Sequence, residues 1–215
     1  MKPYDSFSRR EAFSLIELFA VAGVFAVLAM ILLPGLKAHT CGCRINCVNN
    51  LRQIGLAYNC WALDYGGRYP MAVSTNEGGT KELETTSNAF MSFRVMSNEL
   101  STPKLLVCPT DTQRHWATNF GLDFANARIS YFVGLDATPT NLTLLLSGDR
   151  NLTNTLRLSE GILELRPGDG AGWTPDLHRL AGNVLIADGS VQQLTPFGLR
   201  TTLAQRTTTN RLAMP

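Results

Sequence analysis

The sequence predicts an α+β protein in which a long N-terminal helix packs on a small antiparallel sheet. Three observations lead to this prediction. Residues 13–33 form one apolar run of helix-forming residues, and a second stretch, ending before Gly66, repeats its apolar residues at helical spacing. Beyond Pro70 the chain carries short apolar or alternating runs between turn residues, as antiparallel strands do.

Composition describes a globular chain with one unusual end. The 215 residues are 45% hydrophobic and 17% charged, which excludes a disordered or collagen-like chain. The net charge of +2 predicts no nucleic-acid partner. Residues 13–36, however, contain a single ionisable group, Glu17, whereas the chain after Lys37 has the composition of a water-soluble protein.

The apolar run has the length expected of a transmembrane helix. About 20 helical residues rising 1.5 Å each cover a hydrocarbon core ~30 Å thick. Arg9 and Arg10 precede the run, which predicts a single pass through the inner membrane, a cytoplasmic N-terminus and a periplasmic or extracellular C-terminal domain. The expected segments are a leader (1–12), a transmembrane and assembly helix (13–36), an amphipathic stalk helix (37–66) and an α+β domain (67–215).

Other interpretations of this segment fit less well. A secretory signal peptide would have a shorter apolar core and a small-residue cleavage site, which LKAHTC does not supply. A lipoprotein would need a cysteine directly after a small residue, but Thr40 precedes Cys41. A plain membrane anchor leaves Glu17 unexplained, because an unpaired carboxylate in a membrane helix costs roughly 2.5 kcal/mol or more.

The residues AFSLIEL (12–18) resemble the processing site of type IV prepilins and type II secretion pseudopilins. In that family a dedicated peptidase cuts before the first apolar residue and methylates the new amine, which here implies a cut between Ala12 and Phe13. Glu17 matches the family's glutamate, whose role is to pair with the amine of a neighbouring subunit. Pro34 matches the family's helix-kinking proline. The residue before the cut is usually Gly, so Ala12 departs from the pattern.

The stalk is predicted from helical periodicity. Its apolar residues follow one another at steps of 4, 3, 4, 3 and 4 (Cys47, Leu51, Ile54, Tyr58, Trp61, Tyr65). Gly66 and Gly67 are typical of a helix end, so the helix should stop near Asp64. We expect this face to be core, packed on the domain that follows.

The remaining residues predict short strands and two helices. Ser87 is the expected cap of a helix through Leu100, and Thr195-Pro196 should start a final helix to about Gln205. The tail TTTNRLAMP is expected to fray. Asp188-Gly189 should form a two-residue hairpin turn. Strands are expected at 105–108, 129–135, 142–147, 183–187 and 190–194.

The pair His178 and Asp188-Gly189 resembles the H-x9-DG signature of a pilin-like group in planctomycete and verrucomicrobial bacteria. NNLRQIGLAYNCWALDYGGRYP (49–70), VCPTD (107–111) and NVLIADGSVQQL (183–194) are similar to members of that group as well. His178, Asp188 and Asp149 could be imagined as a metal or acid–base set. We expect instead that Asp188 and Asp149 are turn residues and that His178 bonds to the hairpin backbone.

Five cysteines leave at least one unpaired within the chain. In an oxidising compartment Cys108 should pair with a stalk cysteine, either Cys47 or Cys60. Cys41, Cys43 and Cys47 lie close in sequence. They form no C-x-x-C pair, so no metal site is expected there. No nucleophile motif or Gly-rich phosphate loop is present, so neither an enzyme nor a cofactor is expected.

These observations predict a structural subunit that assembles with homologous subunits into a helical filament after cleavage by a prepilin peptidase. The alternative is a membrane-tethered extracytoplasmic binding protein. Secretion, adhesion, DNA-uptake and motility filaments share this kind of N-terminus, so the sequence does not choose among them.

Overall fold

The computed structural model describes residues 14–32, 39–83, 88–154 and 158–215, with side chains up to residue 30 in the first helix and from residue 44 in the second. The chain divides into two compact units, Met1–Gly42 and Cys43–Pro215. The fold is α+β with an antiparallel sheet, as the sequence predicts.

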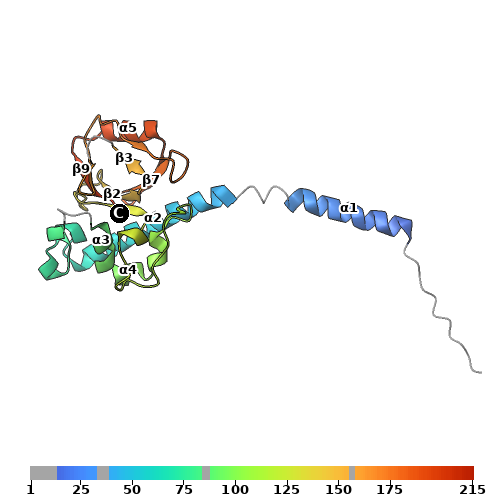
Figure 1. Cartoon of the computed structure of the whole chain (residues 1–215), viewed down its shortest axis with the longest axis horizontal. Coiled ribbons are helices and arrows are strands. Elements are labelled where there is room, and N and C mark those ends of the chain that lie inside the picture. Colours follow the sequence, from blue (N-terminus) through green and yellow to red (C-terminus); the bar gives the residue numbers. More distant parts are fainter. Residues whose placement is uncertain (1–13, 33–38, 84–87, 155–157) are drawn as a thin grey trace, which may run out of the picture. The chain divides into compact units, whose positions relative to one another are not determined.

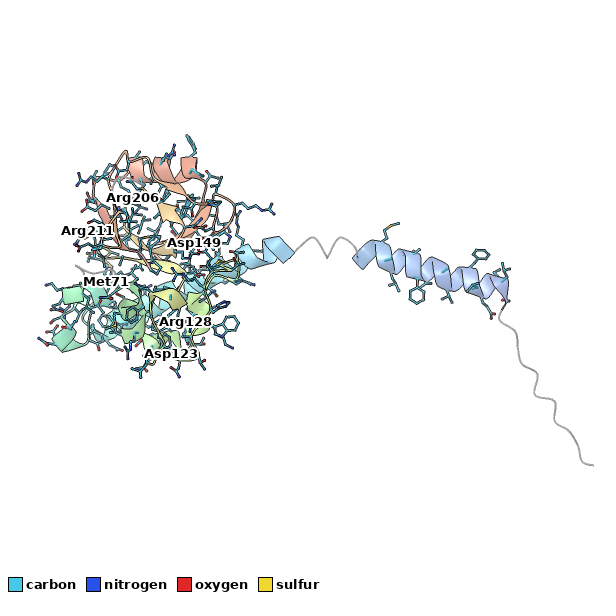
Figure 2. The ribbon with its side chains drawn as sticks, in the orientation of Figure 1. Met71, Asp123, Arg128, Asp149, Arg206 and Arg211 are labelled. Carbon is cyan, nitrogen blue, oxygen red and sulfur yellow. A yellow bond between two sulfur atoms is a disulfide. The ribbon has the colours of Figure 1, made fainter. Side chains whose placement is uncertain are left out.

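The first unit contains α1 (Leu15–Leu32). Ser14 and Glu17 form a capping box at its start: the Ser14 N–H and Oγ donate to Glu17 Oε2 at 2.8 and 2.9 Å, and the Glu17 N–H donates to Ser14 Oγ at 3.3 Å. These bonds lower the pKa of Glu17. Large apolar side chains project from all sides of the helix (Figure 2).

The expected inner-membrane location is contradicted. Among the described residues, no helix has both the length and the apolar character needed to cross a membrane. The predicted single pass through the inner membrane is therefore wrong.

The second unit is built on α2 (His39–Asp64). Its predicted apolar face is buried, with Leu51, Ile54 and Tyr58 fully inaccessible. The helix ends as the sequence predicts: Gly66 and Gly67 have φ of 64° and 72°, and the Gly67 N–H donates to Ala62 O at 2.7 Å. Together they turn the chain away from the helix axis into the domain.

The segment after α2 is made of short helices. Two are α-helical, α3 (Ala89–Val95) and α4 (Ser97–Leu100), in place of the one helix expected. The expected cap Ser87 lies outside the described residues. The others are 3-10 helices, η2 (Pro70–Ala72), η3 (Thr75–Glu77), η4 (Lys81–Leu83), η5 (Pro103–Leu106) and η6 (Asn126–Arg128).

A seven-stranded antiparallel sheet is the centre of the domain, with strand order β4-β5-β9-β1-β2-β7-β8. Its strands are β1 (Tyr131–Gly134), β2 (Leu145–Asp149), β4 (Leu158–Ser159), β5 (Ile162–Leu165), β7 (Gly182–Ile186), β8 (Val191–Leu194) and β9 (Asn210–Ala213). A separate pair, β3 (Leu152–Thr153) and β6 (Gly172–Trp173), lies beyond it.

Both faces of the sheet are covered (Figure 1). Alternate residues of β1 enter different cores: Tyr131 and Val133 pack with α2 and α3, whereas Phe132 packs with α5 (Pro196–Ala204). Because the central strands β1, β2 and β7 are buried along their whole length, any polar side chain on them is removed from water.

Four further expectations from sequence need correction. Residues 105–108 are not a strand, because Pro103 starts the 3-10 helix η5 and the Thr102 side chain caps it. The hairpin loop has three residues, 187–189, since Leu185 pairs with Val191 and the Gly189 N–H bonds to Ile186 O; only Gly189 takes positive φ there.

The other two corrections concern the sheet itself. Asp149 is not a turn residue but the last residue of β2, paired with Tyr131. The tail does not fray: β9 pairs with both β5 and β1, and Leu212 is fully buried. The final helix begins where the sequence predicts, since Thr195 Oγ1 caps α5 by accepting from the Gly198 N–H at 3.2 Å.

Candidate functional site

A disulfide on the buried face of α2 marks the candidate site. Cys47 is bonded to Cys108, which follows η5, with 5.3 Å between their Cα atoms. Of the two partners considered for Cys108, the structure has Cys47. Cys60 lies on the exposed side of α2 as a free cysteine. Cys41 and Cys43 belong to the part of α2 whose side chains are not described.

His178 reaches the disulfide from a strained turn. His178, Arg179 and Leu180 all have positive φ, at 50°, 52° and 62°. Such a run costs roughly 1–2 kcal/mol per residue for side chains with a Cβ, so other contacts must hold it. The buried Asn151 does so, because its Nδ2 donates to the carbonyls of Thr174, Leu177 and Ala181 at 2.9, 3.0 and 3.1 Å.

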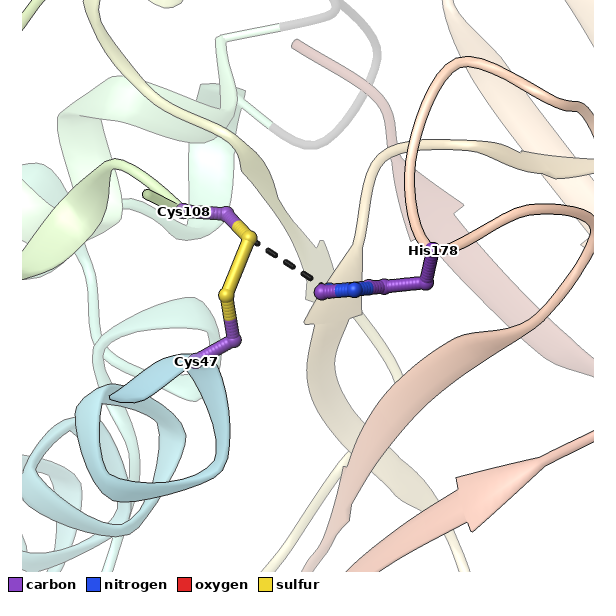
Figure 3. A group of neighbouring side chains, drawn as sticks. All are labelled: Cys47, Cys108 and His178. Atoms are coloured by element: carbon purple, nitrogen blue, oxygen red, sulfur yellow. Dashed lines mark hydrogen bonds between the residues drawn. A yellow bond between two sulfur atoms is a disulfide. The ribbon is translucent and has the colours of Figure 1, made fainter. Parts of the chain in front are cut away.

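The His178 ring points at the disulfide (Figure 3). Its Nε2 lies 3.4 Å from Cys108 Sγ and 3.4 Å from Asp149 Oδ2. The Arg44 guanidinium, one turn before Cys47, donates to the His178 carbonyl at 2.8 Å. Side chains from α2, β2 and two loops therefore meet at one buried point.

Asp149 is the acid of this group, and its side chain is fully buried inside the domain (Figure 2). Its Oδ2 accepts from the Asn183 N–H at 2.7 Å and from Asn183 Nδ2 at 2.8 Å. Burial raises the pKa of Asp149 to about 7 despite these bonds. Burial, with a smaller effect of Arg44, lowers the pKa of His178 to about 4, so its imidazole is neutral near pH 7.

The cluster is not a cysteine–histidine–aspartate catalytic triad. In such a triad one imidazole nitrogen faces the nucleophile and the other is held by the acid. Here the same atom, His178 Nε2, faces both Cys108 and Asp149. The Cys108 sulfur is also bonded to Cys47 and so is no free nucleophile. What the arrangement offers is two sulfurs and an imidazole nitrogen within 4.8 Å of one another.

An ion pair borders the site. Arg150, next to Asp149, donates to both oxygens of Asp111 at 2.7 and 2.9 Å, and the Ser130 hydroxyl donates to Asp111 Oδ2 at 2.7 Å. Burial raises the pKa of Asp111, but the bonds from Arg150 and Ser130 outweigh it and the net shift is downward. This pair ties the loop after Cys108 to the end of β2.

A pocket of about 530 Å³ borders Cys108. Its wall carries cations and an aromatic ring, with Lys104 5.7 Å from the centre of the Trp116 ring. Arg114 and His115 also line it, and Asp111 is its acidic lining residue. Cationic and aromatic groups of this kind suit a small planar or cyclic anion.

The other residues singled out from sequence do not join this cluster. Glu17 lies in the first turn of α1, bonded to Ser14. Ala12, Phe13 and Pro34 lie outside the described residues. Asp188 and Gly189 are exposed in the β7–β8 loop, where Asp188 accepts from the Ser190 N–H. His178 contacts Cys108 and Asp149 rather than that hairpin, contrary to expectation.

Sequence reasoning missed Arg44 and Asn151 as parts of the site, since each comes from a different segment and no motif links them to His178. It considered Asp149 together with His178 but took Asp149 for a turn residue. The Ser14–Glu17 capping box was visible as S-x-x-E before an apolar run. No known protein family, curated protein or solved structure matches the chain.

Proposed function

We propose that the chain is a structural subunit, a pilin or pseudopilin, that assembles into a helical filament through α1 after a prepilin peptidase has cut before Phe13. The observation that carries the proposal is the surface of α1. Ile16, Phe19, Phe25 and Met30 have 77%, 69%, 67% and 74% of their surface exposed, and apolar residues occur all round the helix.

A helix that is apolar on every side needs apolar neighbours on every side. Burying one Leu, Ile, Phe or Met side chain stabilises by ~1.5–3 kcal/mol, so covering α1 is strongly favourable. A dimer would cover one stripe of the helix and leave the rest in water. A filament surrounds each helix with several copies, which is why it fits α1 better than a closed pair.

Glu17 has room for a second role in such a filament. Both described bonds from Ser14 go to Oε2. Its Oε1 is the atom that we assign to the α-amine of a neighbouring subunit's Phe13. Surrounded by apolar helices, that charge pair stabilises only when both members are present, because a lone buried charge is costly.

Two substitutions separate assembly from capping. Glu17→Gln keeps the capping box, since Gln also serves at this position, but loses the charge. Ser14→Ala loses the cap and keeps the charge. Breaking a buried pair costs ~3–5 kcal/mol, so Glu17→Gln should lower the yield of sheared filaments at least about tenfold relative to total subunit, while Ser14→Ala has a small effect.

The subunit level in whole cells is the control for folding and turnover in both variants. Protein from sheared wild-type filaments should begin at Phe13 on N-terminal sequencing. Normal filament yield from Glu17→Gln, or a loss confined to Ser14→Ala, would show that Glu17 only caps the helix.

The pocket beside Cys108 favours a second candidate, a protein that binds a small anion. Lys104, Arg114 and Trp116 are the residues that would recognise it. This function makes no use of the Glu17 charge. If no filaments form and the subunit levels of Glu17→Gln and Ser14→Ala equal that of the wild type, the anion-binding protein is favoured over the filament subunit.

A further inference from the structure

We infer that Cys47, Cys108 and His178 form a zinc site when the disulfide is reduced, with a water molecule in the fourth position. The bond between Cys47 and Cys108 and the bound metal are then alternative states of one site. This inference is independent of the filament function, since it concerns the Cys43–Pro215 unit alone.

The distances suit a tetrahedral zinc ion. Zinc binds sulfur at about 2.3 Å and imidazole or carboxylate atoms at about 2.0–2.2 Å, which places its ligand atoms about 3.3–3.7 Å apart. His178 Nε2 lies 3.4 Å from Cys108 Sγ. The two sulfurs and this nitrogen lie within 4.8 Å of one another, so opening the disulfide brings the sulfurs toward the required spacing.

The charges in and around such a site balance. A zinc ion with two thiolates and one neutral imidazole carries 2 − 2 = 0, so the site itself adds no net charge to the interior. The nearby Asp149 carboxylate is matched by Arg44, whose guanidinium is bonded to the His178 carbonyl at 2.8 Å. Asp149 Oδ1 is buried without a hydrogen-bond partner among the described residues, so it can accept from a water on the metal.

The backbone holds the His178 ring in position before any metal binds. The left-handed run from His178 to Leu180 is held by three bonds from Asn151, and it aims the ring at the sulfurs. Strained segments persist where the surrounding structure holds them, and they concentrate at functional sites. A disulfide joins two segments, whereas the metal would also bind the loop that carries His178.

An external dithiol can reduce the Cys47–Cys108 disulfide and so open the metal site. The dithiol transfers two electrons and two protons to the Cys47–Cys108 bond, giving two thiols, and itself closes to a cyclic disulfide. A zinc ion then displaces the two thiol protons and binds both thiolates with the neutral imidazole. Two protons are therefore released for each zinc ion bound.

Cobalt(II) titration of the whole chain tests the inference. The probe is applied to oxidised protein and to protein reduced by a dithiol that is then removed under argon. Reduced protein should bind one cobalt ion with the ligand-field bands of a tetrahedral thiolate site, zinc should displace it, and two protons should be released. Oxidised protein should give no such bands.

Two variants assign the ligands. A triple variant, Cys41→Ser, Cys43→Ser and Cys60→Ser, leaves only the two site cysteines and should bind as wild type does. Adding His178→Ala to it should weaken binding at least about tenfold, as even outer-shell changes do at zinc sites.

Loss of the cobalt bands in the triple variant would assign the metal to the other cysteines and overturn the inference. So would reduced wild-type protein that binds no metal. X-ray absorption of zinc-loaded wild-type protein tests the site without any substitution. Two sulfur and two nitrogen or oxygen neighbours around the zinc would support the site. Any other number of sulfur neighbours would contradict it.

Discussion

The Asp111 carboxylate is ionised inside the protein because Arg150 is fixed beside it. The Asp111 side chain is fully buried and that of Arg150 is only 10% exposed, with the shortest nitrogen–oxygen distance at 2.7 Å. A buried charge that loses its partner destabilises the fold by ~3–5 kcal/mol, far more than a surface pair contributes.

Arg150→Met should therefore lower the free energy of unfolding near pH 7 by ~3–5 kcal/mol. The loss should shrink as the pH falls. In the wild type the lowered pKa of Asp111 stabilises the fold above the ordinary value of 3.8 and ceases to do so in acid. In the variant, burial raises that pKa, so Asp111 becomes neutral at a higher pH and the penalty disappears.

Chemical denaturation from pH 7 toward pH 4 measures this difference. Arg166→Met is the matched control, because Arg166 pairs with Glu164 on the surface, where their side chains are 51% and 40% exposed. Its effect should stay below about 1 kcal/mol. A constant difference between wild type and Arg150→Met across the pH range would rule out an ionised Asp111 as the cause.

At the scale of elements, the disulfide fixes α2 to the loop that follows η5. The two cysteines are 61 positions apart in the sequence. Closing a loop of this length reduces the entropy of the unfolded chain and stabilises the fold by about 4 kcal/mol. The covered face of α2 packs on the sheet in any case, so the bond adds to a core that already exists.

Replacing Cys47 and Cys108 together by Ser should lower the free energy of unfolding by about 4 kcal/mol in the presence of a chelator. Reduction of the wild type should give a similar loss. Urea denaturation measures both. Cys60→Ser should change nothing, since Cys60 is exposed and unpaired in the described structure. Equal stability of oxidised and reduced wild type would contradict the prediction.

At the scale of the molecule, the last strand in the sequence lies inside the sheet. β9 stands between β5 and β1 and is bonded to both, so β4 and β5 join the rest of the sheet only through the end of the chain. Its Asn210 side chain also accepts from the Leu145 N–H at 3.0 Å, next to the irregular register of β2 and β7.

Deleting residues 210–215 should abolish cooperative folding of the domain, because β1 and β5 lose their common neighbour and both cores lose buried residues. Thermal unfolding followed by circular dichroism tests it. Deleting residues 1–38 is the control, since they belong to the other compact unit, and the melting temperature should stay the same. A cooperative transition in the C-terminal deletion would show that β9 is dispensable.

Much of the local structure was predictable from the sequence. The buried face of α2 follows from its spacing of apolar residues, and its end follows from Gly66 and Gly67. The start of α5 follows from Thr195 and Pro196. Each of these depends on side chains within a few residues of one another, so the relevant interactions can be read from neighbouring positions.

The sequence by itself determined the α+β class, the apolar helix with its one acid, the end of α2 and the start of α5, because these depend on short-range periodicity and capping. Only the tertiary structure decided that a polar tail is an interior strand and that Asp149 is buried. It alone brought His178 to Cys108, 70 positions away. Contacts between distant segments depend on which strands pair and which surfaces are covered, and no local pattern in this chain encodes either.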